Sequence, residues 1–520
     1  MRVCIIGGGF SGVTAASVLQ QRGIEAVVYE RESCVGGVWV HAYPTAQCQN
    51  IASGYHLPTL SWEQAGIRPS LNPTKPELLG YLTAAVQRLK LDVRLSTSID
   101  SCTRGAEEVV KWTVRGRGPA GEFTEEFDFL LVATGMFGTP VPMEFPGQET
   151  FRGRIIGPND MTREVIAELQ GKTLAVVGFG KCALDQATDA ANAGVRTIHV
   201  FRRPGWGVPQ RLLGIHYSWA LWTRLNTVMV PCWDHPTAAA RLLHARARAL
   251  VRAFWALIET VIWGTITAHA WGRGAAARAR VALLRPPTPF IRCFRPSLPI
   301  LPPRYPAHVA SGAIEPVRSA VAGLCAQGLR LIDGRVVEAD VIGLCIGHGS
   351  PVFPFLPKGD RVHLEGMTGG VQLYRHLVHP LVPGVGFVGM NHGFLHMTQV
   401  EIGTLWLSAM MRGELLLPPV SAQLAAADAM RAWKAANEQL CPASNCCVTA
   451  HYPQYNDVLL GDLGMRTGRH TGARALLSYV TRMGASDYAG VVAEYEARLR
   501  SDASGGGGAA PPRRVLDRVM

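Results

Sequence analysis

The sequence has 520 residues, enough for about three or four domains of ordinary size. With 48% hydrophobic and 17% charged residues, it has the composition of a compact globular protein, which excludes wholesale disorder. The net charge of +12 owes much to residues 241–285, which contain eight arginines and one acid, Glu259. No nucleic-acid-binding motif accompanies these arginines, so we expect no nucleic-acid partner.

The twelve cysteines are scattered, without a CxxC pair or metal-ligand spacing. His392 and His396 are four residues apart but have no evident third ligand, so we expect no metal site. The N-terminal apolar run, residues 3–6, is shorter than the roughly 7–15 residues of a secretory signal. We therefore expect a cytoplasmic protein with reduced thiols that is not secreted.

The chain begins with a predicted strand–helix–strand unit. Residues 2–6 form a short apolar run that predicts a buried strand, residues 11–21 have helical spacing, and residues 24–29 predict a second strand. The same plan returns about 170 residues later, with a strand at 172–177, a helix at 181–193 and a strand at 196–201. A repeat of this size predicts two nucleotide-binding units.

The first strand and helix are joined by a GxGxxG loop, Gly7 to Gly12. Gly7 permits the tight turn, Gly9 lets the backbone approach a pyrophosphate, and Gly12 lets the helix pack on the strand. Glu30 ends the second strand, where its carboxylate can accept hydrogen bonds from ribose hydroxyls. The sequence therefore predicts a dinucleotide site whose ribose hydroxyls are free.

The second unit carries a GxGxxA loop, Gly178 to Ala183, in the same context. Its second strand ends in Arg202 and Arg203 rather than in an acid. An acid would repel a 2′-phosphate, whereas two guanidinium groups can pair with it. The second site therefore fits NADPH.

Residues 207–305 are rich in tryptophan, arginine and proline, and residues 254–270 form an apolar helical stretch. Seventeen residues are fewer than the roughly 20 that span a membrane. Tryptophans flanked by arginines are typical of a helix in the membrane interface. Two interpretations stay open: peripheral membrane contact through about residues 250–271, or a helix packed on the second unit or over the substrate pocket.

These features together resemble the flavin-containing monooxygenase family. The motifs that carry the resemblance, besides the two glycine loops, are Gly36-Gly37-Val38-Trp39, Ala133-Thr134-Gly135, Cys345-Ile346-Gly347-His348, Phe353-Pro354-Phe355-Leu356, Phe387-Val388-Gly389, and Glu401 with Trp406. The resemblance covers about residues 1–205 and 310–415. It implies that FAD binds at Gly7, Gly9, Phe10, Ser11, Gly12, Glu30, Arg31, Gly37, Val38, Trp39, Thr134 and Gly135. It implies that NADPH binds at Gly178, Gly180, Lys181, Cys182, Ala183, Arg202 and Arg203.

The sequence departs from the family at the motif FxGxxxHSxxY, which aligns with residues 151–161. Phe151 and Gly153 match, but Gly157 replaces the histidine and Met161 the aromatic residue. This departure weakens a Baeyer–Villiger assignment and predicts a less ordered linker that leaks hydrogen peroxide.

Candidates for residues beside the flavin are few, because the chemistry resides in the cofactor. Gln49 and Asn50 lie near the place where the family carries an asparagine. His348 is either a structural histidine or a cofactor contact. The sequence identifies no catalytic triad.

The predicted fold class is α/β, with two Rossmann-like dinucleotide-binding domains, a helical insert and a helical C-terminal extension. The predicted domains are residues 1–160 and 331–420 (FAD), 161–330 (NADPH, with the insert at about 207–305), 421–500 (helical extension) and 501–520 (flexible tail).

The predicted activity is transfer of one oxygen of O2 to a nucleophilic nitrogen or sulfur of a small molecule, through a flavin C4a-hydroperoxide. The alternatives are Baeyer–Villiger oxygenation of ketones and a divergent flavoprotein that mainly oxidises NADPH. A cofactor-binding protein that does not oxygenate also stays open. The sequence names neither the substrate nor the oligomeric state.

Overall fold

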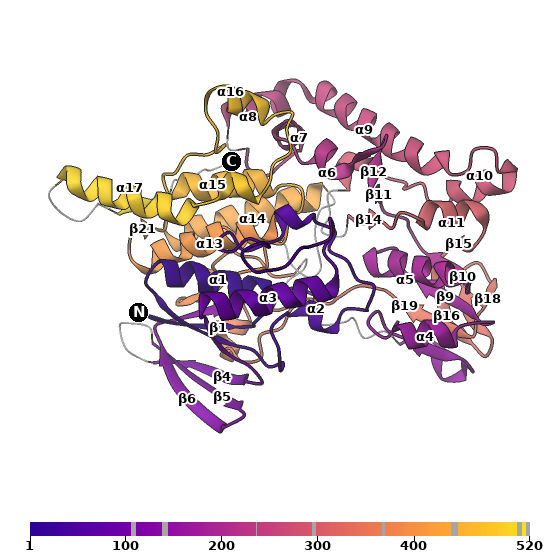
Figure 1. Cartoon of the computed structure of the whole chain (residues 1–520), viewed down its shortest axis with the longest axis horizontal. Coiled ribbons are helices and arrows are strands. Elements are labelled where there is room, and N and C mark those ends of the chain that lie inside the picture. Colours follow the sequence, from indigo (N-terminus) through magenta and orange to yellow (C-terminus); the bar gives the residue numbers. More distant parts are fainter. Residues whose placement is uncertain are drawn as a thin grey trace.

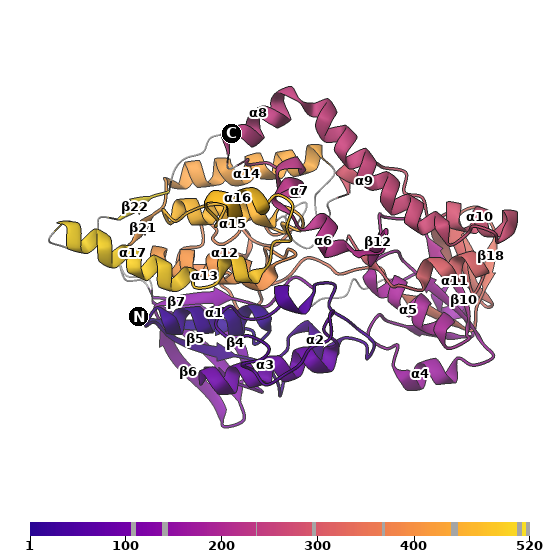
Figure 2. The same cartoon turned by 45° about the horizontal axis from the view of Figure 1, so that its top comes forward.

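The computed structural model describes residues 1–105, 111–137, 144–235, 237–293, 298–366, 370–437, 446–506 and 512–515. Two α/β units lie side by side, with the insert and the C-terminal helices along one edge (Figures 1 and 2). Both units are built on parallel sheets, as the fold class predicted from the sequence requires.

The first unit is a five-stranded parallel sheet. Its strand order is β20 (Val385–Phe387), β7 (Phe129–Val132), β1 (Arg2–Ile6), β2 (Glu25–Tyr29) and β3 (Asp92–Arg94). Helices α1 (Phe10–Gln21), α3 (Lys75–Leu89) and α13 (His396–Met411) belong to this unit, and α1 packs on α13. Strand β1 is an apolar run whose last four residues are buried, which is why its position could be predicted from the sequence.

The second unit is another five-stranded parallel sheet. Its strand order is β15 (Ile314–Arg318), β10 (Arg196–Phe201), β9 (Thr173–Val177), β19 (Val341–Leu344) and β8 (Arg154–Ile156), with α5 (Lys181–Asn192) and α11 (Tyr305–Ser311) packed against it. The boundaries drawn from the sequence at residues 160 and 330 leave β8 and β19 outside this unit. Their pairing corrects those boundaries, because β19 hydrogen-bonds to both β8 and β9.

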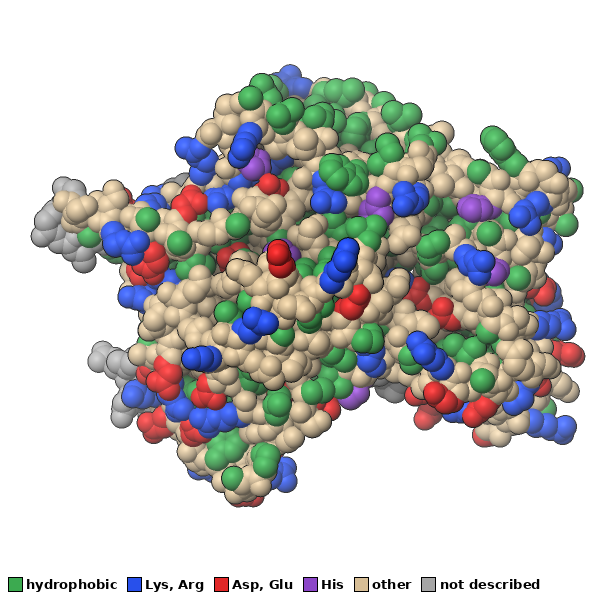
Figure 3. Space-filling model, viewed as in Figure 1, with side chains coloured by type: hydrophobic (Ala, Val, Ile, Leu, Met, Phe, Trp, Pro, Cys, Tyr) green, Lys and Arg blue, Asp and Glu red, His purple; other side chains and the backbone are tan. Residues whose placement is uncertain are grey.

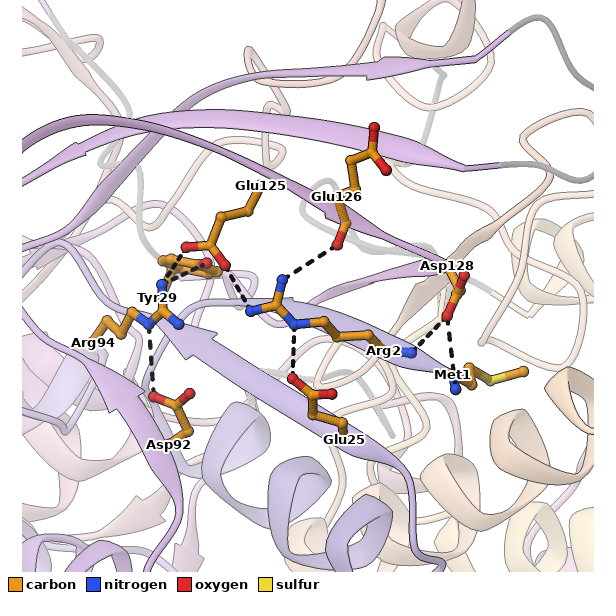
Figure 4. Close-up of polar contacts among 9 residues, drawn as sticks. All are labelled: Met1, Arg2, Glu25, Tyr29, Asp92, Arg94, Glu125, Glu126 and Asp128. Carbon is orange, nitrogen blue, oxygen red and sulfur yellow. Dashed lines mark hydrogen bonds and ion pairs between the residues drawn. The ribbon is translucent and has the colours of Figure 1, made fainter.

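Two antiparallel meanders flank the sheets. One consists of β4 (Ser98–Arg104), β5 (Trp112–Gly118) and β6 (Gly121–Phe127), and the other of β16 (Val321–Cys325), β17 (Gly328–Leu331) and β18 (Val336–Glu338). A charged cluster ties the first meander to β1–β3 (Figure 4). Arg2 donates to Glu25 at 2.8 Å and to Glu125 at 2.6 Å, and Arg94 pairs with the same Glu125.

The insert is largely helical. Its elements are β11 (Val208–Pro209), β12 (Arg211–Leu212), β13 (Ile215–His216), α6 (Tyr217–Leu221), α7 (Arg224–Met229), α8 (Ala238–Arg246), α9 (Arg248–Ala268), α10 (Gly274–Ala282) and β14 (Ile300–Leu301). Helix α9 begins six residues before the predicted stretch at 254 and has 21 residues. Within the described part of the chain, α9 is the helix whose length and composition would permit it to cross a membrane. This criterion is weak evidence for a single helix.

The C-terminal extension contains α14 (Val420–Ala436), α15 (Tyr452–Asp462), α16 (Gly472–Leu477) and α17 (Val491–Gly506). The prediction of a flexible tail from residue 501 is wrong in two places. Helix α17 continues to residue 506, and β22 (Arg513–Arg514) pairs in parallel with β21 (Leu415–Leu416). Val515 is buried, so apolar packing and strand pairing order a segment whose composition predicts none.

Candidate functional site

The first glycine loop is held against the end of the neighbouring strand. Gly7 has φ +112°, and a Cβ there would stand 2.6 Å from the carbonyl oxygen of Ala133. A Cβ on Gly12 would stand 1.9 Å from the carbonyl oxygen of Gly7. Both glycines are therefore required by the packing of the loop between β1, α1 and β7.

Gly9 has a different role, because it faces a second loop. A Cβ on Gly9 would meet only Gly37, at 3.4 Å, and the Gly36 amide donates to the Gly8 carbonyl at 3.1 Å. The two loops meet at the N-terminus of α1, where free amide groups and the helix dipole favour a phosphate. This glycine-lined cradle fits a pyrophosphate.

Glu30 is buried at the end of β2. Its Oε2 accepts from the Gly8 amide at 2.6 Å and its Oε1 from the Glu32 amide at 2.9 Å. These bonds orient the carboxylate beside the glycine loop. Each oxygen keeps a second lone pair for a ribose hydroxyl.

Phe10 and Ser11 are directed into the protein rather than outward. The Phe10 ring packs against Tyr55 and Tyr81 in the core. The Ser11 hydroxyl lies 2.9 Å from Nε2 of His396, at the start of α13. Only the backbone of these two residues is therefore available to a phosphate.

The remaining residues predicted for the first site surround the cradle. Val38 and Trp39 lie on α2 (Val38–His41), and the Trp39 indole is 3.4 Å from the Tyr55 hydroxyl. Thr134 and Gly135 follow β7, and the space at the Cα of Gly135 is open. The Arg31 side chain is exposed at the end of β2 and pairs with Glu32.

The second glycine loop repeats the first in detail. Gly178 has φ +126°, and a Cβ there would stand 2.1 Å from the carbonyl oxygen of Cys345, the counterpart of Ala133. Gly178 donates to Val200 at 2.9 Å as Gly7 donates to Tyr29 at 2.9 Å. The space at the Cα of Gly180 is open. The second site thus offers the same cradle.

The basic residues predicted for the second site differ in whether an acid already pairs with them. Arg202 and Arg203 are exposed after β10, and neither forms an ion pair with any residue that the structure describes. Lys181 is already neutralised, because its Nζ lies 2.6 Å from Oδ2 of Asp185. Cys182 and Ala183 lie in the first turn of α5, where burial raises the pKa of the Cys182 thiol.

Two hydrogen bonds that the sequence does not predict join the first unit to the second. Tyr43 donates to Asp185, and Thr45 donates to Asp189, so the segment after α2 is bound to one face of α5. Burial raises the pKa of the Asp189 carboxyl to about 6. The i,i+4 spacing of the two acids indicates a shared helix face, but nothing in the sequence pairs them with residues 142 and 144 positions away.

Gln49 and Asn50 connect the first site to the insert. Gln49 Oε1 accepts from the Ile300 amide at 2.7 Å, and its carbonyl accepts from the Tyr217 hydroxyl. The Asn50 side chain donates to the Phe394 carbonyl at 2.5 Å. The Gln49 side chain is thus committed to the insert, and Asn50 to the segment that precedes α13.

Beyond these contacts lies a narrow apolar pocket. It is lined by Val208, Tyr217, Leu221, Trp222, Asn226, Thr227, Val230, Trp255, Phe290, Leu298, Ile300, Phe394, Ala450 and Tyr452. None of these residues is charged. The Trp222 indole N–H is buried without a hydrogen-bond partner in the described parts of the chain. The pocket therefore suits an uncharged molecule with a hydrogen-bond acceptor.

The linker motif is better packed than the sequence predicts. The Gly157 amide donates to Oδ2 of Asp160 at 2.7 Å, and Gln186 donates to the Pro158 carbonyl at 2.6 Å. Met161 is 2% exposed and packs in the core in place of the expected aromatic residue. Contacts from Asp160, Gln186 and Met161 therefore hold this segment, and the predicted peroxide leak stays a prediction.

Burial favours the neutral form of the histidines near the first site. Burial lowers the pKa of His392 to about 4 and that of His396 to about 3. Burial also lowers the pKa of His348, whose ring packs on Phe137. In the described ranges no cluster of His, Cys, Asp and Glu could hold a metal. Cys446 and Cys447 are buried, and Cys441 lies outside the described residues.

Comparison with known proteins agrees with this geometry. Residues 1–222 match the family model described as pyridine nucleotide-disulphide oxidoreductase. The chain is 25% identical to the probable flavin-containing monooxygenase 1 of Arabidopsis thaliana, over 94% of this chain and 96% of the relative.

Solved structures share the fold. The S-allyl-L-cysteine S-oxygenase of Allium sativum is 16% identical, with a TM-score of 0.59, over 96% of this chain and 98% of that one. A steroid monooxygenase bound to NADP is 19% identical, with a TM-score of 0.61, over 96% and 98%. OTEMO in complex with FAD and NADP is 16% identical, with a TM-score of 0.60, over 79% and 84%.

The two glycine-lined cradles fit two dinucleotide cofactors, the first with free ribose hydroxyls beside Glu30 and the second with a 2′-phosphate beside Arg202 and Arg203. More narrowly, the chain is similar along most of its length to flavin-containing monooxygenases of Arabidopsis thaliana, and a solved cyclohexanone monooxygenase shares its fold.

Proposed function

We propose that the chain uses NADPH and O2 to oxygenate an uncharged, largely apolar small molecule at a soft nucleophilic atom, with sulfur favoured over a protonated nitrogen. The balance is NADPH, a proton, O2 and a thioether giving NADP⁺, water and a sulfoxide. Bound FAD supplies the redox and oxygen chemistry. The residues of this chain bind and orient the cofactors and exclude water.

The observation that carries the proposal is that no charged side chain lines the apolar pocket. Gln49 and Asn50 contact this pocket through Ile300 and Phe394. An ammonium group would enter without a carboxylate partner, at a large desolvation cost. A neutral thioether has no such cost. Arg202 and Arg203, free of partners among the described residues, support NADPH rather than NADH.

A second candidate is Baeyer–Villiger oxygenation. The partnerless Trp222 indole N–H favours it, since a ketone carbonyl accepts a hydrogen bond better than a thioether does. Replacement of the family histidine by Gly157 argues against it.

The test is a matched panel: an aryl methyl thioether, the aryl methyl ketone of the same size, and a tertiary aliphatic amine. NADPH consumption, peroxide release and product mass are measured for each from pH 6.5 to 9.5. We expect a sulfoxide at a kcat/KM that changes little with pH, and amine turnover that rises with pH as the neutral amine becomes populated. An ester product from the ketone alone would establish the second candidate. Amine turnover that is highest at low pH would contradict the uncharged pocket.

A further inference from the structure

One edge of the molecule carries a concentration of exposed large hydrophobic side chains. Figure 3 shows them along the upper edge, over α8, α9 and α16. Six of them, all more than half exposed, define what we call the apolar face: Trp219, Leu242, Leu250, Leu257, Trp271 and Leu476. A contiguous apolar surface of this kind marks an interaction site rather than ordinary surface composition.

The apolar face is one surface, although its residues come from distant parts of the sequence. The Arg224 amide donates to the Ser478 carbonyl at 3.1 Å, which places the end of α16 beside α7. The Arg482 guanidinium lies 4.6 Å from the centre of the Trp219 ring. Helix α8 packs on α9. The insert and the C-terminal extension therefore present the face together.

Helix α9 carries apolar residues on two sides, and only one of these sides packs against the rest of the protein. Trp255 and Ile262 are buried against the insert, whereas Leu250 is 55% and Leu257 65% exposed. Residues 250 and 257 are seven apart and so lie on one stripe of the helix. No described residue covers this stripe.

Polar contacts attach the middle of α9 to the rest of the insert. The Trp255 indole donates to the Met229 carbonyl at 2.7 Å, and Glu259 accepts from Arg285 at 2.5 Å and from the Phe290 amide at 2.9 Å. A helix held in this way lies on a surface rather than across a bilayer.

The surroundings of the apolar face are positively charged. Exposed arginines flank it on α8, α9 and the start of α10: Arg241, Arg246, Arg248, Arg252, Arg273 and Arg278. None of them forms an ion pair with a residue in the described ranges. Asp234 and Glu259 are the only acids between residues 190 and 314 of the sequence. Apolar residues ringed by unpaired arginines are complementary to anionic headgroups over acyl chains.

We propose that this chain, which the sequence predicts to be cytoplasmic, docks peripherally on an anionic bilayer through the apolar face, with α9 parallel to the membrane plane. The inference goes beyond the oxygenation reaction and does not depend on its substrate.

The test is co-sedimentation of the FAD-loaded protein with vesicles of phosphatidylcholine, with and without phosphatidylglycerol. Leu250→Gln with Leu257→Gln removes the outer stripe, and Arg248→Gln with Arg252→Gln removes charge. Ile332→Gln with Val336→Gln is the matched control, since both side chains are exposed but lie at the β17–β18 end of the second unit. Melting temperatures check that each variant is folded.

We expect binding to anionic vesicles by the unmodified protein and the control, and at least tenfold weaker binding by the leucine variant. The arginine variant should lose the preference for phosphatidylglycerol, and carbonate washing should release the bound protein. Equal binding by the leucine variant and the control would overturn the proposal. A second outcome would also overturn it: the unmodified protein is a dimer in light scattering, the leucine variant is a monomer, and neither binds vesicles. The apolar face would then be covered by a second copy of the chain. Resistance to carbonate washing would show that α9 inserts across the bilayer.

Discussion

A Cβ on Gly9 would stand 3.4 Å from the Cα of Gly37, and no other heavy atom outside this second loop lies as near. The first glycine loop and the GG-x-W loop thus face each other closely. Gly9 and Gly37 are 28 positions apart in the sequence and are brought together only by the fold.

Gly9→Ala should fold but lose FAD. Its φ of −75° suits any residue, and the contact with Gly37 is an ordinary one, so the apo-protein should melt normally. The methyl group, however, would occupy the approach of the phosphate. Flavin absorbance per protein measures occupancy. Gly12→Ala is the contrasting variant, because its Cβ would clash with the Gly7 carbonyl and should prevent folding. Full flavin occupancy in Gly9→Ala would place the cofactor elsewhere.

Arg202→Ala with Arg203→Ala should bring NADPH and NADH close to parity. A charge-assisted bond to a phosphate at a partly exposed site is worth about 1.5–3 kcal/mol, or roughly ten- to a hundredfold. Because both side chains are exposed, the melting temperature should not change. The ratio of kcat/KM for the two cofactors is the measurement. An unmodified protein that uses NADH equally well would refute the role of both arginines.

Asp160→Ala should increase peroxide release. The Asp160 carboxylate accepts from the Gly157 amide, so its removal frees the linker that joins the two units. A looser linker should position the nicotinamide cofactor less firmly. The fraction of NADPH oxidation that ends as hydrogen peroxide should rise severalfold, with Asn159→Ala as the neighbouring surface control. An unchanged fraction would mean that Met161 and the Gln186 contact suffice.

Asp189→Asn should make the protein more stable, and increasingly so as the pH rises. Burial raises the pKa of Asp189 from 3.8 to about 6, so the folded state prefers the protonated form. Ionisation therefore costs stability above pH 6, by at most about 3 kcal/mol, and this cost disappears as the pH falls toward 4. Melting temperatures of the variant and the unmodified protein should differ at pH 7.5 and converge as the pH falls to about 4. Asp92→Asn, at an exposed position, is the control. A difference independent of pH would show that Asp189 is not destabilised by burial.

The sequence alone determined the two nucleotide-binding units and their glycine loops, and the cofactor contacts of individual residues stay predictions. The strands at 2–6 and 196–201 are found as predicted, and α1 and α5 differ by one residue from their predicted bounds. The reason is local: a buried strand, a turn that only glycine permits and a helix N-terminus follow one another within twelve residues. Each imposes a residue type at a set position.

Only the tertiary structure decided the rest. The pocket collects Tyr217, Trp255, Phe394 and Tyr452 from segments up to 235 residues apart, and Gln49 reaches it through Ile300. Such contacts depend on how helices of the insert and the C-terminal extension pack together, and packing leaves no periodic signal in the sequence. The linker at residues 157–161 also depends on tertiary contacts. Its glycine, Gly157, by itself predicts a flexible backbone. The Asp160 carboxylate beside it and the Gln186 side chain from α5 hold it in place, because backbone order is set by hydrogen-bond partners that fold in from elsewhere.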